Sequence, residues 1–146
     1  MSLNNKILCV DDEESILRGF QLNLRKNFKI HLASDGQEGL EVFKREGGFA
    51  VVLSDMRMPR MNGAEMLAAI KKIDPEVVTV LLTGFTDFES AMAAVNEGNV
   101  FRMLSKPCPP DTLNRVLLDA VNQYDLICSK RILLDQTLRG AVDALA

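Results

Sequence analysis

Five polar side chains stand directly after apolar stretches of the sequence, where buried strands would end. They are Asp11, Asp12, Asp55, Thr83 and Lys106. Because parallel strands present their carboxyl ends at one edge of a sheet, we expect these residues to meet in one small volume. Three carboxylates within about 5 Å of one another repel, so such a site favours a bound cation. Oxygen ligands select a hard cation, and we predict Mg²⁺.

The same side chains are suited to chemistry at phosphorus. Asp55 ends the apolar run at residues 51–54, and Pro59 prevents that strand from continuing. A carboxylate held beside a metal ion and a lysine can attack a phosphorus atom while the two cations neutralise the phosphoryl oxygens. We therefore place Asp55 at the centre of the site, with Thr83 and Lys106 beside it.

Apolar segments alternate with amphipathic segments along the whole chain. The predicted strands cover residues 6–10, 28–33, 50–54, 77–82 and 100–104. Between them, hydrophobic residues recur at helical spacing. Asn62 with Glu65, and Thr86 with Glu89, have the spacing of helix caps. Near-continuous apolar strands indicate a parallel sheet covered on both faces, and we expect a flavodoxin-like, doubly wound α/β fold with the order 2-1-3-4-5.

The composition is that of one globular domain. The chain has 146 residues, 47% hydrophobic and 25% charged, and a net charge of -3. This charge argues against direct nucleic-acid binding. The 3 cysteines form no CxxC pair, which argues against a zinc site and indicates reduced thiols. With no leader and no apolar run of membrane-spanning length, we expect a cytoplasmic protein that does not bind a membrane.

Taken together, the acids, Thr83 and Lys106 resemble the receiver domain of two-component response regulators. The resemblance covers residues 4–125. It implies that Asp55 accepts a phosphoryl group from a sensor histidine kinase or phosphotransfer protein. It also implies a Mg²⁺ site, with Asp12 binding directly, Asp11 through water or in support, and Asp55 and the backbone carbonyl of Arg57 as further ligands.

The resemblance implies a conformational switch as well. Lys106 would hold the phosphoryl oxygens, its peptide bond to Pro107 being cis, and Thr83 would turn its hydroxyl towards them and move the following loop. The family usually has Tyr or Phe three residues before the lysine, where this sequence has Met103. Phe101 is expected on the same strand face and is a candidate substitute.

Two further side chains bear on the lifetime of the phosphorylated state in such a domain. Arg57 and Phe85 each follow a site residue by two positions. A long cation and an aromatic ring at these places are expected to shield an aspartyl phosphate from water. The resemblance therefore predicts a long-lived phosphorylated form.

The C-terminal part of the sequence predicts one long helix that begins near Asp111. Hydrophobic residues three and four apart form a heptad seam with one charged member. The seam consists of Leu117, Ala120, Tyr124, Ile127, Arg131, Leu134, Leu138, Ala141 and Leu145. We predict that residues 126–146 extend beyond the domain as a coiled-coil-like linker and form a homodimer. Residues 130–145 are similar to linkers that join receivers to HD-type output domains, notably cyclic-di-GMP phosphodiesterases.

Two other classes of function share part of the pattern. A dinucleotide-binding protein would have the same fold, but no Gly-rich phosphate loop follows the first strand. The alternative is a Mg²⁺-dependent phosphatase with an aspartyl nucleophile. Such an enzyme usually carries a second Asp two residues after the nucleophile, where this sequence has Arg57. We predict a signalling module rather than a turnover enzyme.

Overall fold

One parallel sheet organises the computed structural model, which describes residues 3–145 and the side-chain environment of residues 3–140. Its strand order is β2-β1-β3-β4-β5, which confirms the predicted fold. The strands are β1 (Lys6–Val10), β2 (Lys29–Ala33), β3 (Val51–Asp55), β4 (Val78–Thr83) and β5 (Arg102–Ser105). β3 and β4 are buried at every position because helices cover both faces of the sheet. This explains why the central strands are continuous apolar runs in the sequence.

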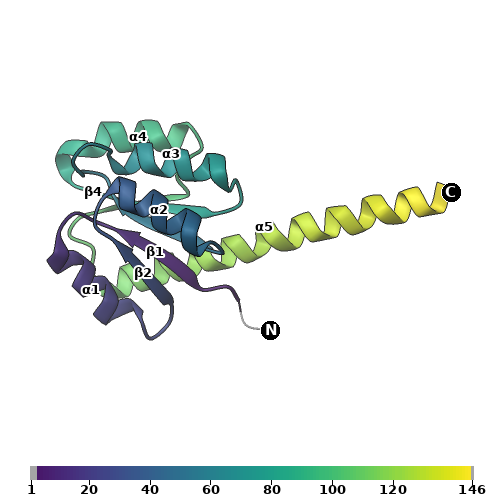
Figure 1. Ribbon diagram of the computed structural model, residues 1–146, viewed down its shortest axis with the longest axis horizontal. Helices are drawn as coiled ribbons and strands as arrows, with labels where there is room; N and C mark the ends of the chain where they lie inside the picture. Colours follow the sequence, from purple (N-terminus) through teal and green to yellow (C-terminus); the bar gives the residue numbers. More distant parts are fainter. Residues whose placement is uncertain (1–2, 146) are drawn as a thin grey trace.

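Helices follow the strands in alternation and lie on both faces of the sheet. They are α1 (Glu14–Leu24), α2 (Gly36–Glu46), α3 (Gly63–Ile73), the 3-10 turn η1 (Phe85–Asp87), α4 (Phe88–Asn96) and α5 (Pro110–Leu145). Figure 1 shows α2, α3 and α4 on one face, with α1 and the first half of α5 on the other. This doubly wound arrangement leaves the carboxyl edge of the sheet open for a site.

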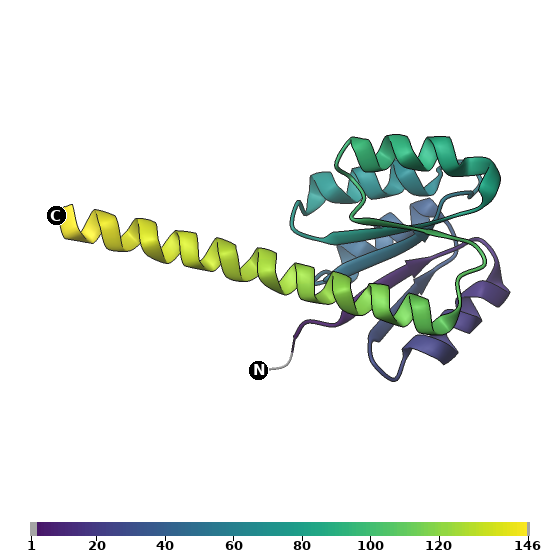
Figure 2. The ribbon, with the colours of Figure 1, turned by 180° about the vertical axis from the view of Figure 1, so that it is seen from behind.

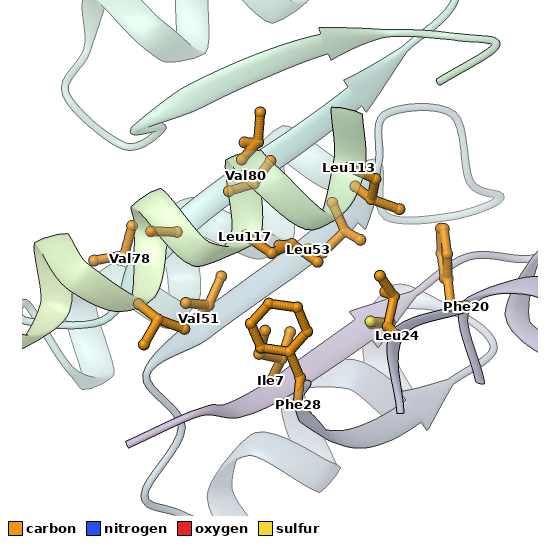
Figure 3. Close-up of a cluster of buried hydrophobic side chains, with 14 of the residues drawn as sticks. Ile7, Phe20, Leu24, Phe28, Val51, Leu53, Val78, Val80, Leu113 and Leu117 are labelled. Atoms are coloured by element: carbon orange, nitrogen blue, oxygen red, sulfur yellow. The ribbon is translucent and has the colours of Figure 1, made fainter. Parts of the chain in front are cut away.

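Two hydrophobic cores lie on opposite faces of the sheet. Successive residues of a strand point to opposite faces, so Leu53 packs beneath α1 and α5 whereas Val52 packs beneath α2, α3 and α4. Figure 3 shows the first core, in which Ile7, Leu53 and Leu117 are fully buried. Side chains of β3 pack into both cores, and this packing fixes the position of Asp55 at the end of the strand.

The start of α4 differs from the sequence-based expectation. The Asn62–Glu65 capping box forms as predicted at α3. The cap predicted at Thr86 and Glu89 is wrong, because Thr86 lies within η1 and α4 begins only after that turn. The Thr86 hydroxyl instead accepts a hydrogen bond of 3.3 Å from Nη2 of Arg57.

The first half of α5 packs against the sheet and ends at an ion pair with the body of the domain. Leu117 and Ala120 are fully buried, and Ile127 packs at the edge of the same core. Further along, Nε of Arg131 lies 2.6 Å from Oε2 of Glu76, just before β4. The predicted seam therefore faces the chain's own domain as far as Arg131.

Beyond Arg131, α5 projects away from the domain (Figures 1 and 2). Leu134 and Leu138 of the predicted seam are 55% and 64% exposed. The seam side chains of Ala141 and Leu145 lie outside the described residues. Within the described part of the chain, α5 and the other helices lack the length of apolar sequence needed to cross a membrane.

Candidate functional site

The carboxyl edge of the sheet brings the predicted site residues together. Asp11 and Asp12 follow β1, Asp55 ends β3, and Thr83 ends β4. Asp11, Asp12 and Asp55 each offer a carboxylate oxygen, and these oxygens lie within 4.8 Å of one another. The cluster therefore has the spacing that a shared cation needs.

Lys106 enters the cluster from the loop after β5. Its Nζ lies 3.0 Å from Oδ1 of Asp55 and 3.5 Å from Oδ2 of Asp11. The peptide bond between Lys106 and Pro107 is cis, as expected. The side chain is 28% exposed, so its ammonium lies between the buried acids and solvent.

Burial makes the negative charge of Asp11 and Asp55 costly. Asp11 has no exposed surface, and burial, with a smaller contribution from the charge of Asp55, raises its pKa from the ordinary 3.8 to about 6. The backbone N–H of Glu13 donates to Oδ1 of Asp11 at 2.9 Å and partly opposes that shift. Burial also raises the pKa of Asp55, against the lowering effects of Lys106 and of a hydrogen bond from the backbone N–H of Arg57.

Lys106 offsets only part of this charge. Burial acts to lower its pKa, but its contacts with Asp55 and Asp11 together outweigh burial and raise it, so the ammonium stays charged. One ammonium among three carboxylates leaves an excess of negative charge. A divalent cation fits this donor set, because the ligands are hard oxygens and the exposed Asp12 leaves one side open for water.

An open cleft of ≈ 260 Å³ lies above Asp55. It is lined by Asp12, Glu13, Asp55, Arg57, Gly84, Thr86, Asp87 and Lys106. The Arg57 side chain reaches across it to η1, where Nη2 lies 3.2 Å from Oδ1 of Asp87. Phe85 is 98% exposed, so the expectation that its ring shields the site is wrong for this conformation.

The predicted switch residues occupy three different environments. The Thr83 hydroxyl donates to the carbonyl oxygen of Gly84 at 3.1 Å, so it is engaged with its own loop. Met103 is half-buried against the core beneath α4. Phe101 is not part of β5, which begins at Arg102, and its ring lies beneath the guanidinium of that residue.

Sequence reasoning missed Gly63, which lies directly beneath the site. Its backbone N–H donates to the carbonyl oxygen of Met56 at 2.9 Å. A Cβ at this position would overlap the carbonyl oxygen of Asp55 and lie 2.9 Å from Cδ1 of Leu81. The neighbouring cap residue Asn62 was a local signal for the start of a helix, but nothing local indicates that this backbone touches that of Asp55.

The fold, the acidic cluster and the lysine are the features of one known family. The sequence profile of the response regulator receiver domain matches residues 7–118. The protein belongs to this family. Receivers are two-component signalling modules that take a phosphoryl group from histidine kinases and bind Mg²⁺ at an acidic cluster such as the one formed here by the three aspartates.

Known relatives place this receiver among regulatory proteins. The transcriptional regulatory protein GlrR of Escherichia coli (strain K12) is 36% identical over 118 residues, which are 80% of this chain and 26% of the relative. The chain thus spans about a quarter of the length of the curated relatives it matches. A crystal structure titled adenylate cyclase from Rhodopirellula baltica is 41% identical, with a TM-score of 0.89, and the match covers 91% of this chain and 98% of that one.

A second solved structure is the signal receiver domain of an HD domain-containing protein from Pseudomonas fluorescens Pf-5. It is 32% identical, with a TM-score of 0.77, and the match covers 84% of this chain and 98% of that one. The names of these relatives thus include a transcriptional regulator, a cyclase and an HD-domain protein. All three match this chain over the receiver, but their names indicate different functions.

Proposed function

We propose that this receiver accepts a phosphoryl group on Asp55 from a histidine kinase or phosphotransfer protein. The observation that carries the proposal is the 3.0 Å contact between Nζ of Lys106 and Oδ1 of Asp55, within a cluster of three carboxylates. An ion pair with a structural role alone would not need two further acids beside it. The surplus negative charge favours a cation, and a cation is what the oxygens of an incoming phosphoryl group require.

The transfer follows from the positions of these side chains. A carboxylate oxygen of Asp55 attacks the phosphorus, and a P–O bond forms as the P–N bond of the phosphohistidine breaks. The electron pair of that bond returns to the imidazole of the donor. Lys106 balances charge on the phosphoryl oxygens, and Thr83 turns from the Gly84 carbonyl to donate to one of them.

We assign the metal site to Asp11, Asp12, Asp55 and the backbone carbonyl of Arg57. When bound there, Mg²⁺ supplies positive charge to the phosphoryl oxygens. Asp12 is exposed and can bind the ion directly, whereas Asp11 is buried and held by the Glu13 N–H, which suits an indirect role.

Acetyl phosphate provides a direct test of the proposal without a kinase. We expect intact-mass spectrometry to show one added phosphoryl group in the presence of Mg²⁺ and none after chelation. Peptide mapping should locate the group on the segment that contains Asp55. Repeated hydrolysis of a phosphate ester without a stable adduct would instead support the phosphatase.

Mg²⁺ binding should weaken in acid. Because the pKa of Asp11 is raised to about 6, protons compete with the cation below that pH. We expect the affinity for Mg²⁺ at about pH 5 to be roughly tenfold lower than at about pH 7.5. Calorimetry is the suitable measurement, because the chain has no tryptophan whose fluorescence could report binding. In Asp11→Asn this pH dependence should be much smaller, and an undiminished dependence would contradict the assignment to Asp11.

The same pKa has a consequence for stability without metal. The folded chain holds the Asp11 proton more tightly than the unfolded chain, because its pKa is raised from 3.8 to about 6. The stabilisation from this proton is present in acid and is lost as the pH rises through about 6. Added Mg²⁺ should therefore raise the unfolding temperature more at neutral pH than in acid.

We further propose that residues 4–125 form the receiver and that residues 126–146 are a linker, of which the part beyond Arg131 pairs with a second copy. The support is the exposure of Leu134 and Leu138 on a helix segment that projects beyond the domain. Apolar residues at this spacing are typical of a helix that is covered by a partner helix.

Light scattering tests the pairing. We expect the protein to have twice the 16.2 kDa chain mass, and the double variant Leu134→Asp, Leu138→Asp to have the mass of one chain. Leu22→Asp is the control, because Leu22 is at least as exposed, at 68%, but lies on α1. A wild-type protein of single-chain mass would contradict the proposal.

The output that the linker controls is a separate proposal. An HD-type phosphodiesterase is supported by the similarity to the Pseudomonas fluorescens receiver at 32% identity. The relative titled adenylate cyclase is 41% identical, so a cyclase is an equally grounded candidate for the effector. To distinguish the two candidates, the receiver and linker would be fused to each effector, and cyclic nucleotide turnover would be measured with and without acetyl phosphate. The effector whose activity changes with acetyl phosphate is the one supported.

A further inference from the structure

The Arg57 side chain joins the phosphoacceptor loop to the loop after β4. Its Nη2 lies 3.2 Å from Oδ1 of Asp87 and 3.3 Å from Oγ1 of Thr86, both in η1. The same residue follows Asp55 by two positions in the sequence and lines the cleft beside it. Arg57 thus lies next to the reacting carboxylate and contacts the loop that follows the switch residue.

These contacts hold the β4–α4 loop in the conformation seen here. The Thr83 hydroxyl donates to the Gly84 carbonyl, so turning it towards Asp55 breaks that bond and removes one restraint on the loop. Arg57 restrains the same loop from across the cleft, two and three residues further on. Movement of this loop therefore requires the hydrogen bonds from Arg57 to Asp87 and Thr86 to break.

An anion on Asp55 would compete with Asp87 for this guanidinium. Asp55, Arg57 and Asp87 line the same cleft, and the Arg57 side chain is 73% exposed, so it can reorient at small cost. A phosphoryl group brings about -1.5 to -2 charges and accepts paired hydrogen bonds from a guanidinium, a stronger partner than one carboxylate oxygen.

We propose that Arg57 is a positioning residue that exchanges Asp87 for the phosphoryl oxygens on Asp55. In the unmodified receiver Arg57 holds η1 closed. In the modified receiver it binds the phosphoryl group and releases η1, so the loop is free to follow Thr83. This inference rests on the proposed modification of Asp55, and it assigns to Asp87 the role of the competing anion.

The test uses beryllium fluoride with Mg²⁺, a non-covalent phosphoryl mimic, and measures its affinity by calorimetry. Asp87→Asn keeps the side-chain shape and removes the competing charge, so binding should tighten roughly two- to fivefold, the range of an exposed ion pair. Arg57→Gln should weaken binding. In the double variant the gain from Asp87→Asn should vanish, because the gain acts through Arg57.

Glu13→Gln is the control for a general effect of charge. Glu13 also lines the cleft and is exposed, and its backbone N–H, not its side chain, donates to Asp11. Its substitution should tighten binding less than Asp87→Asn does, and equally in the wild-type and Arg57→Gln backgrounds.

The position of the loop gives an independent readout. Without the mimic, the amide signal of Gly84 in Asp87→Asn should move part of the way towards its position in the mimic-bound wild type. The exchange is overturned if Asp87→Asn tightens binding of the mimic no more than Glu13→Gln does. It is also overturned if Asp87→Asn tightens binding as much in the Arg57→Gln background as in the wild type. In both cases the role of Asp55 stands. A wild type that takes up neither the mimic nor a phosphoryl group overturns both.

Discussion

Asp55→Asn should take up no phosphoryl group from acetyl phosphate under conditions in which the wild type takes up one. The amide has nearly the same shape as the carboxylate but lacks its nucleophilic oxygen. Its carbonyl oxygen can still accept a hydrogen bond from Nζ of Lys106, which lies 3.0 Å from Oδ1 of Asp55 in the wild type. We therefore expect loss of the reaction with retention of the fold, measured by intact mass and circular dichroism.

The stability of this variant provides a second readout. Removing one of three clustered carboxylates relieves repulsion, so the metal-free variant should unfold at a temperature no lower than that of the wild type. Asp35→Asn is the matched control: Asp35 caps α2 outside the cluster, and an amide oxygen can keep that bond. It should be modified normally. An Asp55→Asn chain that still gains a phosphoryl group would place the acceptor elsewhere.

Gly63→Ala should cost about 3 kcal/mol of unfolding free energy, as overpacking in a rigid core does. The added Cβ overlaps the Asp55 carbonyl oxygen, which is backbone and cannot rotate away, and it lies 2.9 Å from Cδ1 of Leu81. Relief requires α3 or the end of β3 to shift. Chemical denaturation should show the loss, and modification by acetyl phosphate should slow even where the variant is folded.

Gly19→Ala is the control for the loss of a glycine as such. Gly19 lies inside α1, and within the described structure a Cβ there meets no atom closer than 4 Å. Alanine should therefore stabilise the helix by about 0.5–1 kcal/mol. If both substitutions stabilise the protein, the close approach of Gly63 to Asp55 is not a constraint in solution.

The sequence was sufficient to predict the sheet and the acidic cluster because both depend on local patterns. Asp55 and Lys106 follow short apolar runs, and the rule that parallel strands end at one edge converts these places into neighbours. The strand bounds shifted by one or two residues, as at β5, because strand ends depend on pairing with the neighbouring strand as well as on composition.

The contacts that connect separate loops could not be predicted in the same way. Thr86 and Glu89 have the spacing of a helix cap, but the Thr86 hydroxyl accepts a hydrogen bond from Arg57 instead. That hydrogen bond depends on how two loops meet in space. The role of Gly63 likewise depends on the packing of α3 against β3. A cap or turn signal describes a few adjacent residues, whereas these contacts are between residues brought together only by the complete fold.

The ion pair between Arg131 and Glu76 holds α5 at the point where it leaves the domain, so the helix beyond this point can act as a lever. Asp55 lies at the carboxyl edge of the sheet, whereas Glu76 precedes β4 at the opposite edge. The helix beyond Arg131 is about 20 Å long at 1.5 Å per residue, so a tilt of about 10° at its base displaces its tip by roughly 3–4 Å. That exceeds the helix shifts of about 1–2 Å that operate many allosteric interfaces. In the proposed linker, the displacement of the tip would then depend on the stiffness of this helix and of its ion pair with Glu76, and only small movements would be needed within the receiver itself.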